Sequence, residues 1–402
     1  MNAQGRERSR WAILALITVA HALGSLSVLA AAPLSPFLLD ALELSRTQVG
    51  LFLPALYLGG VLASLPAGWL SDRLGVRRAL VLGQGLTGAA VGLAALSPSF
   101  AVLLGFLFLG GFGWSVLNPT TGKAVIEWFP PRERGFAMGV KQTGLTLGGI
   151  AGALVLPPLA LALGWRLSLA VAGAASLLSA ALVAFGYRTR SGYLAEAPPE
   201  RPRFAEVTPF LQRRGVLVVF GCGLALSMAQ SSVLAYLVLY AKEVLAVSVV
   251  DAGRLLALAQ AGGAAARLGW GLVSDRLFGG RRRPGIIVTA LIGATSYIAF
   301  AFGGALPSRL AAPLAVIAGA GAFGWVGLYL ALVAEIAGVR YAGLLTGVAV
   351  MFAWSGVLVG PPLFGVVLEA TGSYVGAWLL LSAYALLVAA ALSRLQPLVQ
   401  RG

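Results

Sequence analysis

The sequence predicts an all-α membrane protein whose chain crosses a lipid bilayer twelve times. Apolar residues make up 59% of the 402 residues and charged residues only 11%, less than half the charged share of an ordinary globular domain. A membrane-spanning helix needs about 20 mostly apolar residues, so twelve spans would use about 240, which the apolar content nearly matches. This composition excludes a soluble, a disordered and a collagen-like chain, and a single cysteine excludes a disulfide scaffold.

Twelve apolar runs are long enough to span a bilayer. The first resembles a signal peptide at its end, but it is too long for the apolar region of such a peptide, so we expect it to remain as a helix. The predicted spans lie at residues 11–32, 48–70, 79–96, 100–122, 135–160, 166–186, 215–239, 252–273, 285–306, 311–334, 343–367 and 374–393.

The basic residues indicate the orientation of these spans. If the N-terminus is cytoplasmic, the outer loops carry only five of the 29 Lys and Arg, two lie inside spans, and the other 22 lie in inner loops and tails. This asymmetry predicts a protein of the cytoplasmic (inner) membrane with both termini in the cytoplasm. It also explains the net charge of +15 without a nucleic-acid partner. The five outer residues are Arg46, Arg166, Lys242, Arg254 and Arg309.

The chain divides into two halves of six spans. Residues 188–214 form the only long polar stretch, which contains Pro198, Pro199 and Pro202 and is typical of a linker loop. We therefore predict an N-terminal bundle over residues 1–187, a cytoplasmic linker over 188–214 and a C-terminal bundle over 215–402.

An internal repeat relates these halves. The stretch from Gly68 to Leu74 (GWLSDRL) recurs from Gly271 to Leu277 (GLVSDRL), at an offset of 203 residues. Further pairs follow in the same order at offsets of 203 to 211, among them Gly113-Trp114 with Gly324-Trp325 and Glu127 with Glu335. Two parallel repeats are typical of transporters that bind a substrate between their halves.

These residues resemble the major facilitator superfamily, whose signature between helices 2 and 3 is Gly-x-x-x-Asp-Arg-x-Gly-x-Arg-Arg. The first copy has Gly68, Asp72, Arg73, Gly75, Arg77 and Arg78, and the second has Asp275, Arg276, Gly279, Arg281 and Arg282 around an inserted Phe278. The resemblance implies two six-helix bundles, a monomer, and a conformational latch formed where the cytoplasmic side is closed. The alternative is a plain loop whose charges only orient the chain.

The candidate latch combines the signature residues with one loop arginine. Gly68 and Gly271 would allow close approach of helices. Asp72 and Asp275 would face a helix N-terminus or an arginine such as Arg134. The complete set is Gly68, Asp72, Arg73, Arg77, Arg134, Gly271, Asp275 and Arg276.

Charged residues inside spans are costly and usually functional. Arg267 lies eight residues before Asp275, about 12 Å along the helix. Gln260 lies seven residues earlier on the same face, and Tyr57 is its repeat counterpart. We predict that Arg267 binds a carboxylate or similar anion, and the alternative is an arginine that pairs with protein groups.

Further candidates come from other spans. Lys141 would contact substrate or snorkel to the cytoplasmic interface. His21 would carry a proton, accept a hydrogen bond from substrate or pack as a neutral residue. The remaining candidate substrate-binding residues are polar or aromatic positions in spans: Trp114, Asn118, Gln142, Gln230, Tyr236, Trp325 and Tyr329.

The charge balance of the predicted site favours an anion. No Asp or Glu is predicted at the depth of Arg267 and Lys141, so an organic cation would be repelled. The stretch from Arg267 to Asp275 resembles helix 8 of monocarboxylate and oxalate/formate-type transporters, which implies that Arg267 contacts a carboxylate. The chain departs from animal-type monocarboxylate carriers at Gly263 and Leu34, where they have aspartate and lysine, which puts their proton route in doubt.

The sequence thus predicts a secondary transporter that moves a small organic anion, a monocarboxylate by the resemblance, by rocker-switch alternating access. Proton symport and exchange for a counter-anion both stay open, as does the direction. The alternative is an efflux pump for drugs or other lipophilic compounds, although Phe106 and Leu145 replace the arginine and proline of the usual exporter signatures. A membrane enzyme, a cofactor and a metal site are not expected, because catalytic and metal-ligand patterns are missing from the sequence. A receptor that senses substrate without transport is a further alternative.

Overall fold

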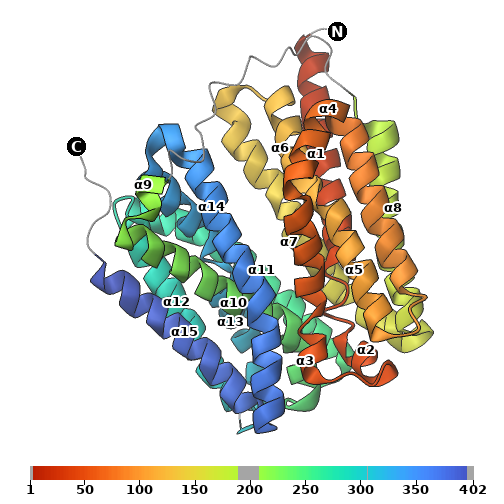
Figure 1. The fold of residues 1–402 in the computed structure, drawn as a ribbon, viewed down its shortest axis with the longest axis vertical. Coiled ribbons are helices and arrows are strands. Elements are labelled where there is room, and N and C mark those ends of the chain that lie inside the picture. Colours follow the sequence, from red (N-terminus) through yellow and green to blue (C-terminus); the bar gives the residue numbers. More distant parts are fainter. Residues whose placement is uncertain (1–2, 189–207, 306, 396–402) are drawn as a thin grey trace. The chain divides into compact units, whose positions relative to one another are not determined.

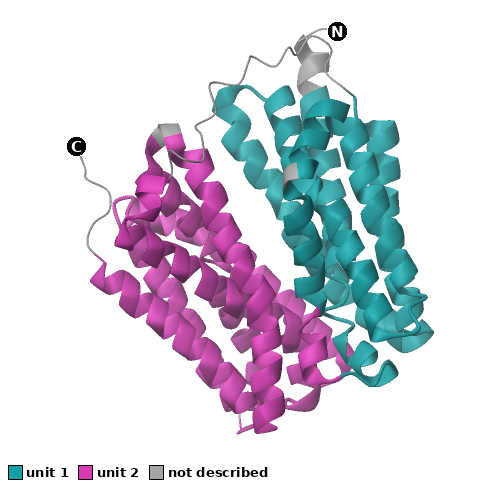
Figure 2. Cartoon of the chain, in the orientation of Figure 1, with its two compact units in different colours: residues 1–44, 52–195 teal, residues 45–51, 196–402 magenta. Residues whose placement is uncertain are grey.

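The computed structural model describes residues 3–188, 208–305 and 307–395, and every regular element in these residues is helical (Figure 1). The chain forms two compact units (Figure 2): unit 1 contains residues 1–44 and 52–195, and unit 2 contains residues 45–51 and 196–402. The segment Ser45–Leu51, predicted to belong to the first half, lies in unit 2. Most of the predicted linker, residues 189–207, lies outside the described residues.

Unit 1 contains the first six predicted spans. Its helices are α1 (Ala3–Val28), α2 (Ser35–Ala41), α4 (Phe52–Ala94), α5 (Phe100–Ser115), α6 (Leu117–Trp128), α7 (Pro131–Leu163) and α8 (Trp165–Gly186). Helix α4 holds two predicted spans. Gly75 of the signature lies between them and adopts φ +74°, which breaks the regular helix at this residue. This backbone conformation favours glycine, which explains the glycine at this point of the motif.

Unit 2 contains the other six spans. Its elements are α3 (Arg46–Val49), α9 (Thr208–Leu211), α10 (Arg214–Glu243), α11 (Val249–Arg276), α12 (Arg282–Ala301), η2 (Gly303–Ala305), η3 (Ser308–Leu310), α13 (Ala311–Phe323), α14 (Val326–Thr371) and α15 (Tyr374–Arg394). Helix α14 also holds parts of two spans, which meet at Gly338 with φ +69°.

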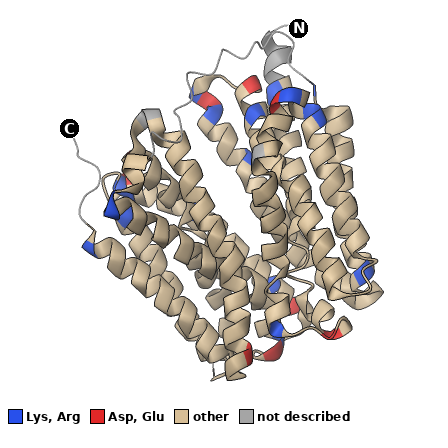
Figure 3. Cartoon of the chain, in the orientation of Figure 1, with Lys and Arg blue, Asp and Glu red and all other residues tan. Residues whose placement is uncertain are grey.

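The predicted fold class is confirmed. Ten helical stretches of the described chain are long and apolar enough to cross a membrane. The other two predicted spans, residues 79–96 and 252–273, fall on the second part of α4 and on α11. The charged residues of each unit gather mainly at the ends of its helices and in its loops (Figure 3), as expected for a protein that spans a bilayer.

In unit 1, α4 and α5 cross closely at two glycines. A Cβ atom at Gly59 would collide with the carbonyl oxygen of Phe108, and one at Gly111 would collide with that of Leu56. The backbones of α4 and α5 therefore touch at Gly59 and Gly111, where glycine leaves room for the close approach, as in other close helix crossings.

In unit 2, α11 and α13 cross in the same way. A Cβ at Gly262 would collide with the carbonyl oxygen of Val316, and one at Gly319 with that of Ala259. Each of these four residues follows its counterpart in unit 1 by 203 or 208 positions. The sequence repeat is thus also a repeat of helix packing.

The close approach predicted at Gly68 and Gly271 is not found among the described residues. A Cβ at either position would meet no atom within 4 Å. The close crossings lie about nine residues earlier in the same helices, at Gly59 and Gly262.

Candidate functional site

Lys141 is a buried cation in unit 1. Its side chain, on α7, is only 5% exposed. The ammonium Nζ donates to the side-chain oxygen of Asn118 at 3.1 Å, to the Asn118 carbonyl at 3.4 Å and to the Thr121 hydroxyl at 3.2 Å. These three neutral acceptors match the three donors of an ammonium group.

The charge of Lys141 has no carboxylate partner among the described residues. Every ion pair there joins other side chains. Burying a charge is costly unless another charge or a set of hydrogen bonds compensates it. Lys141 has the hydrogen bonds but not the opposite charge, so the interior of unit 1 carries an uncompensated positive charge.

His21 lies beside this lysine. Its side chain is fully buried on α1, and neither ring nitrogen has a hydrogen-bond partner in the described part of the chain. The imidazole ring meets the Trp114 ring edge to face, with 5.8 Å between the ring centroids. A Cβ at Gly144 of α7 would come within 2.9 Å of the His21 Cβ, so glycine lets α1 approach α7 one turn beyond Lys141.

Four predicted substrate-binding residues thus lie together in unit 1. We use the name Lys141 cluster for these four and Thr121, which the sequence did not single out: His21, Trp114, Asn118, Thr121 and Lys141. Trp114 is half-buried and Asn118 is exposed, so the cluster reaches the surface of unit 1 at these two residues. Two further candidates, Tyr57 on α4 and Gln142 on α7, are half-buried.

Arg267 in unit 2 is half-buried on α11. Its Nε donates to the carbonyl oxygen of Phe323, the last residue of α13, at 2.8 Å. This contact caps the end of α13, where helix carbonyls lack intrahelical partners. Gln260, two turns earlier on α11, is buried with 7% exposure.

The aromatic candidates of unit 2 are bonded to protein atoms. Trp325 donates its indole N–H to the side-chain oxygen of Gln230 at 3.1 Å. The Tyr329 hydroxyl donates to the carbonyl of Ala349 at 3.4 Å, and the fully buried Tyr236 donates to the carbonyl of Arg46 at 2.7 Å. The two tyrosine bonds tie side chains to the backbone of another segment, and a substrate contact for these residues stays a prediction.

In unit 1 the signature aspartate pairs with a lysine that was not predicted as its partner. Asp72 lies 3.1 Å from Lys123 of α6, whose ammonium also donates to the Ser71 carbonyl at 3.2 Å. Arg134, the expected partner, donates instead to the carbonyls of Ile126 and Phe129. The reason is that the last carbonyls of α6 need donors, and Arg134 supplies them.

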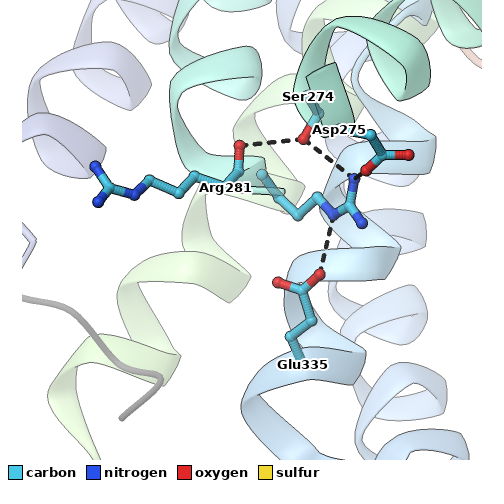
Figure 4. A network of polar contacts seen from close by, with 5 residues as sticks. Ser274, Asp275, Arg281 and Glu335 are labelled. Carbon is cyan, nitrogen blue, oxygen red and sulfur yellow. Dashed lines mark hydrogen bonds and ion pairs between the residues drawn. The ribbon is translucent and has the colours of Figure 1, made fainter. Parts of the chain in front are cut away.

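In unit 2 the signature aspartate belongs to a larger network (Figure 4). One guanidinium, Arg282, binds the carboxylates of Asp275 at 2.5 Å and Glu335 at 2.9 Å, and it donates to the Ser274 hydroxyl at 3.1 Å. Ser274 in turn donates to the Arg281 carbonyl at 3.1 Å. The sequence repeat pairs Glu335 with Glu127, which was the available signal for its role.

The other latch candidates have separate contacts. Arg77 donates to the carbonyl of Ala184 near the end of α8, where a cation stabilises the C-terminus of a helix. The Arg73 guanidinium lies 5.0 Å from the centre of the Trp69 ring. Arg276 is exposed as the last residue of α11.

A short segment of unit 2, residues Ser45–Leu51, makes polar contacts that the sequence did not predict. We call it the strap. Its helix α3 begins with a capping box between Ser45 and Gln48. Two carboxylates hold it: Glu243 pairs with Arg46 at 2.9 Å, and Glu369 accepts the hydroxyl of Thr47 at 2.5 Å. The sequence shows these only as isolated charges at helix ends.

The chain is similar to known membrane transporters in sequence. A family model described as Major Facilitator Superfamily matches residues 14–361. An MFS-type transporter of Mycobacterium tuberculosis is 30% identical over 386 residues, which cover 94% of this chain and 83% of that protein. The hexuronate transporter of Bacillus subtilis is 26% identical (90% and 88% covered), and the probable sulfoacetate transporter of Cupriavidus necator is 27% identical (92% and 90% covered).

Solved structures show the same fold. A bacterial homolog of the human lysosomal transporter Spinster, in an inward-facing and unoccupied conformation, aligns with a TM-score of 0.79 at 19% identity, over 96% of this chain and 95% of that chain. A D-xylose-proton symporter aligns with a TM-score of 0.75 at 17% identity, over 96% and 98%. The chain therefore belongs to the Major Facilitator Superfamily, a family of membrane transporters and not of enzymes.

Proposed function

We propose that this protein is a secondary transporter of small organic anions that works by alternating access of its two units. The observation that carries the proposal is Lys141, a buried cation with neutral partners and no carboxylate among the described residues. A bound anion would supply the missing negative charge. Arg267, half-buried on α11, would be a second anion contact, because a guanidinium binds carboxylates bidentately.

The sequence relatives support an anionic substrate. The hexuronate and sulfoacetate transporters are named for organic anions, and their similarity extends over nine tenths of this chain. These substrates all carry a carboxylate. The monocarboxylates that the resemblance of residues 267–275 to helix 8 of other transporters implies carry one too. We propose a monocarboxylate as the substrate, with hexuronates included in that class.

The membrane potential limits how transport of an anion can be coupled to the movement of other ions. Moving one net negative charge inward costs about 2.3 kcal/mol per 100 mV of a negative-inside potential. Uptake would therefore need a co-transported proton or an exchanged counter-anion, whereas export would not. We propose that the protein acts in the cytoplasmic membrane with both termini cytoplasmic, on the basis of the distribution of its basic loops. We also propose a monomer, which is what the family resemblance implies.

Alternating access requires contacts that exist in only one state. The pairs Asp72–Lys123 and Asp275–Arg282 lie at the loop ends of the signature helices and are partly exposed. Such pairs form and break at little cost, because solvent screens them. We propose that they act as latches.

The test is transport by the purified protein in proteoliposomes. Labelled lactate, glucuronate and sulfoacetate would be compared with a labelled quaternary amine. We expect saturable uptake of one or more acids, reduced at least about ten-fold in Arg267→Ala, a loss equal to one charged contact. The matched control is Arg254→Ala on the same helix, an exposed arginine paired with Asp251.

Two results would contradict the proposal. Uptake of the amine without uptake of any acid would identify a cation or drug carrier. Acid uptake that persists unchanged in Arg267→Ala would remove this arginine from the anion site.

A further inference from the structure

His21 is the only histidine of the chain, and the latch and anion contacts described above do not use it. It is fully buried, and both ring nitrogens are without a partner among the described residues. Ser25, one turn along α1, donates its hydroxyl to the His21 backbone carbonyl at 2.7 Å and not to the ring. A buried polar atom without a partner is costly and requires an explanation.

The packing around the ring explains how it is held. Gly144 and Gly148 let α7 lie directly against α1, so that a Cβ at Gly148 would collide with the carbonyl of Ala22. Trp114 closes another side of the ring through its edge-to-face contact. The contact with α7 therefore fixes the α1 backbone that carries His21 before any ligand arrives, which lowers the cost of binding.

The charged neighbour sets the chemistry that the ring offers. Lys141 lies one turn before Gly144 on α7, and a Cβ at Gly144 would come within 2.9 Å of the His21 Cβ. Burial without a hydrogen-bond partner and a nearby ammonium both favour the neutral form of the imidazole. A neutral imidazole has one donor nitrogen and one acceptor nitrogen. A hydroxyl group, which both donates and accepts, complements either of them.

We propose that His21 binds a hydroxyl group of the substrate while Lys141 binds its carboxylate, so that the protein selects hydroxylated carboxylic acids over plain ones. This inference rests on the proposed function and names the substrate class of the same site. Asn118 and Trp114, at the surface end of the Lys141 cluster, mark the approach. The carboxylate would replace the oxygens of Asn118 around the ammonium, and the Trp114 ring would move aside to admit the hydroxyl.

The test uses pairs of acids that differ by one hydroxyl group. Lactate and propionate, glycolate and acetate, and 3-hydroxybutyrate and butyrate would be compared as inhibitors of uptake and as ligands in thermal-shift titrations. We expect the wild-type protein to favour the hydroxylated member by about ten-fold or more, because a site that hydrogen-bonds a hydroxyl discriminates against the analogue that lacks it.

Variants at His21 then separate recognition from packing. In His21→Phe the preference should fall to about one, with the affinity for the plain acid changed less than about two-fold, because only the hydroxyl contact is removed. His21→Gln, whose amide has a donor and an acceptor, should restore part of the preference. The matched control is Ser25→Ala, which removes a buried hydroxyl one turn away and should leave the preference unchanged.

Each outcome decides the matter. A preference that is unchanged in His21→Phe, or a wild-type preference for the plain acids, would overturn the role of His21 while leaving anion transport intact. Absence of binding by every acid in the folded wild-type protein would instead reject the proposed function. If His21→Phe does not fold, His21→Gln and His21→Asn carry the same test through their intermediate preferences.

Discussion

The interiors of the two units differ in how their polar side chains are compensated. In unit 1 the ammonium of Lys141 is surrounded by neutral oxygens, and the ring nitrogens of His21 have no partner in the described chain. In unit 2 the indole of Trp325 and the hydroxyl of Tyr329 are bonded to protein atoms, and Arg267 caps the end of α13.

The packing of the same two units is repeated. The glycine crossings of α4 with α5 and of α11 with α13 match position by position. By the offset of these crossings, Arg267 corresponds to Ser64, so the charge has no counterpart in unit 1. The repeat therefore preserves the glycines at the helix crossings, whereas the residues proposed to bind substrate differ between the units.

Removing the charge of Lys141 should have the largest effect and should separate function from stability. In Lys141→Met we expect organic-anion uptake to fall about 30-fold or more, since loss of a buried charge contact costs roughly 2–5 kcal/mol. The melting temperature should stay the same or rise, because a buried charge without an opposite charge is replaced by an apolar group of similar size. Uptake assays and thermal unfolding in detergent measure the two effects.

The matched variant is Lys242→Met, which changes an exposed lysine at the end of α10. It should leave uptake and stability nearly unchanged. A Lys141→Met protein that unfolds at a clearly lower temperature would show that this lysine stabilises unit 1. That result would contradict the view that its charge is uncompensated.

The glycine crossings should respond equally in both units. Gly59→Val and Gly262→Val should each destabilise the protein by about 1–3 kcal/mol or more, because the new side chain overlaps a backbone carbonyl. Gly68→Val and Gly271→Val, with open space at both positions, serve as controls and should change stability little. A strong effect in only one unit would contradict the packing repeat.

The polar bonds of unit 2 should be worth less. Trp325→Phe removes the indole N–H that Gln230 and the Ala322 carbonyl share, and it should lower the free energy of unfolding by about 1 kcal/mol, the usual net value of one hydrogen bond. Trp69→Phe, at an indole that is 58% exposed, is the control. If Trp325→Phe abolishes uptake without loss of stability, Trp325 belongs to the substrate site. The difference between the two units in how their polar side chains are bonded would then not separate substrate contacts from structural ones.

The latch pairs should give the smallest effects. Asp72→Asn and Asp275→Asn keep the size of the side chain and remove its charge, and the pairs are partly exposed. We expect changes in uptake rate of up to about five-fold, equal to the 0.2–1 kcal/mol of a surface pair. Asp275→Asn should have the larger effect because Arg282 links it to Glu335. Unaltered rates in both variants would contradict the latch role.

The fold could be predicted because its sequence signals extend over many residues. Apolar runs, basic loops and the signature repeat predict the helices, and the break at Gly75 falls within the motif. Side-chain partners were harder to predict, because they depend on which helices approach each other in space. Lys123 pairs with Asp72 across 51 positions of sequence, and no local pattern favours it over Arg134.

The candidate site was predicted in part for the same reason. A lysine and a histidine within apolar spans stand out by their cost, so both were identified. That Lys141 binds Asn118 and Thr121 depends on the contact between α6 and α7. The strap could not be recognised, because its partners Glu243 and Glu369 lie about 200 to 320 positions away.

We propose that the protein binds organic anions through the buried Lys141 and the half-buried Arg267. The most direct measurement is a thermal-shift screen of the purified protein in detergent against carboxylates, organic cations and neutral lipophilic compounds, with Arg267→Ala and Lys141→Met in parallel. A ligand of the folded state raises its apparent stability with the logarithm of its concentration. We predict stabilisation by carboxylates that disappears in both variants. Stabilisation by cations or neutral compounds, unchanged in the variants, would contradict the account and favour an efflux pump.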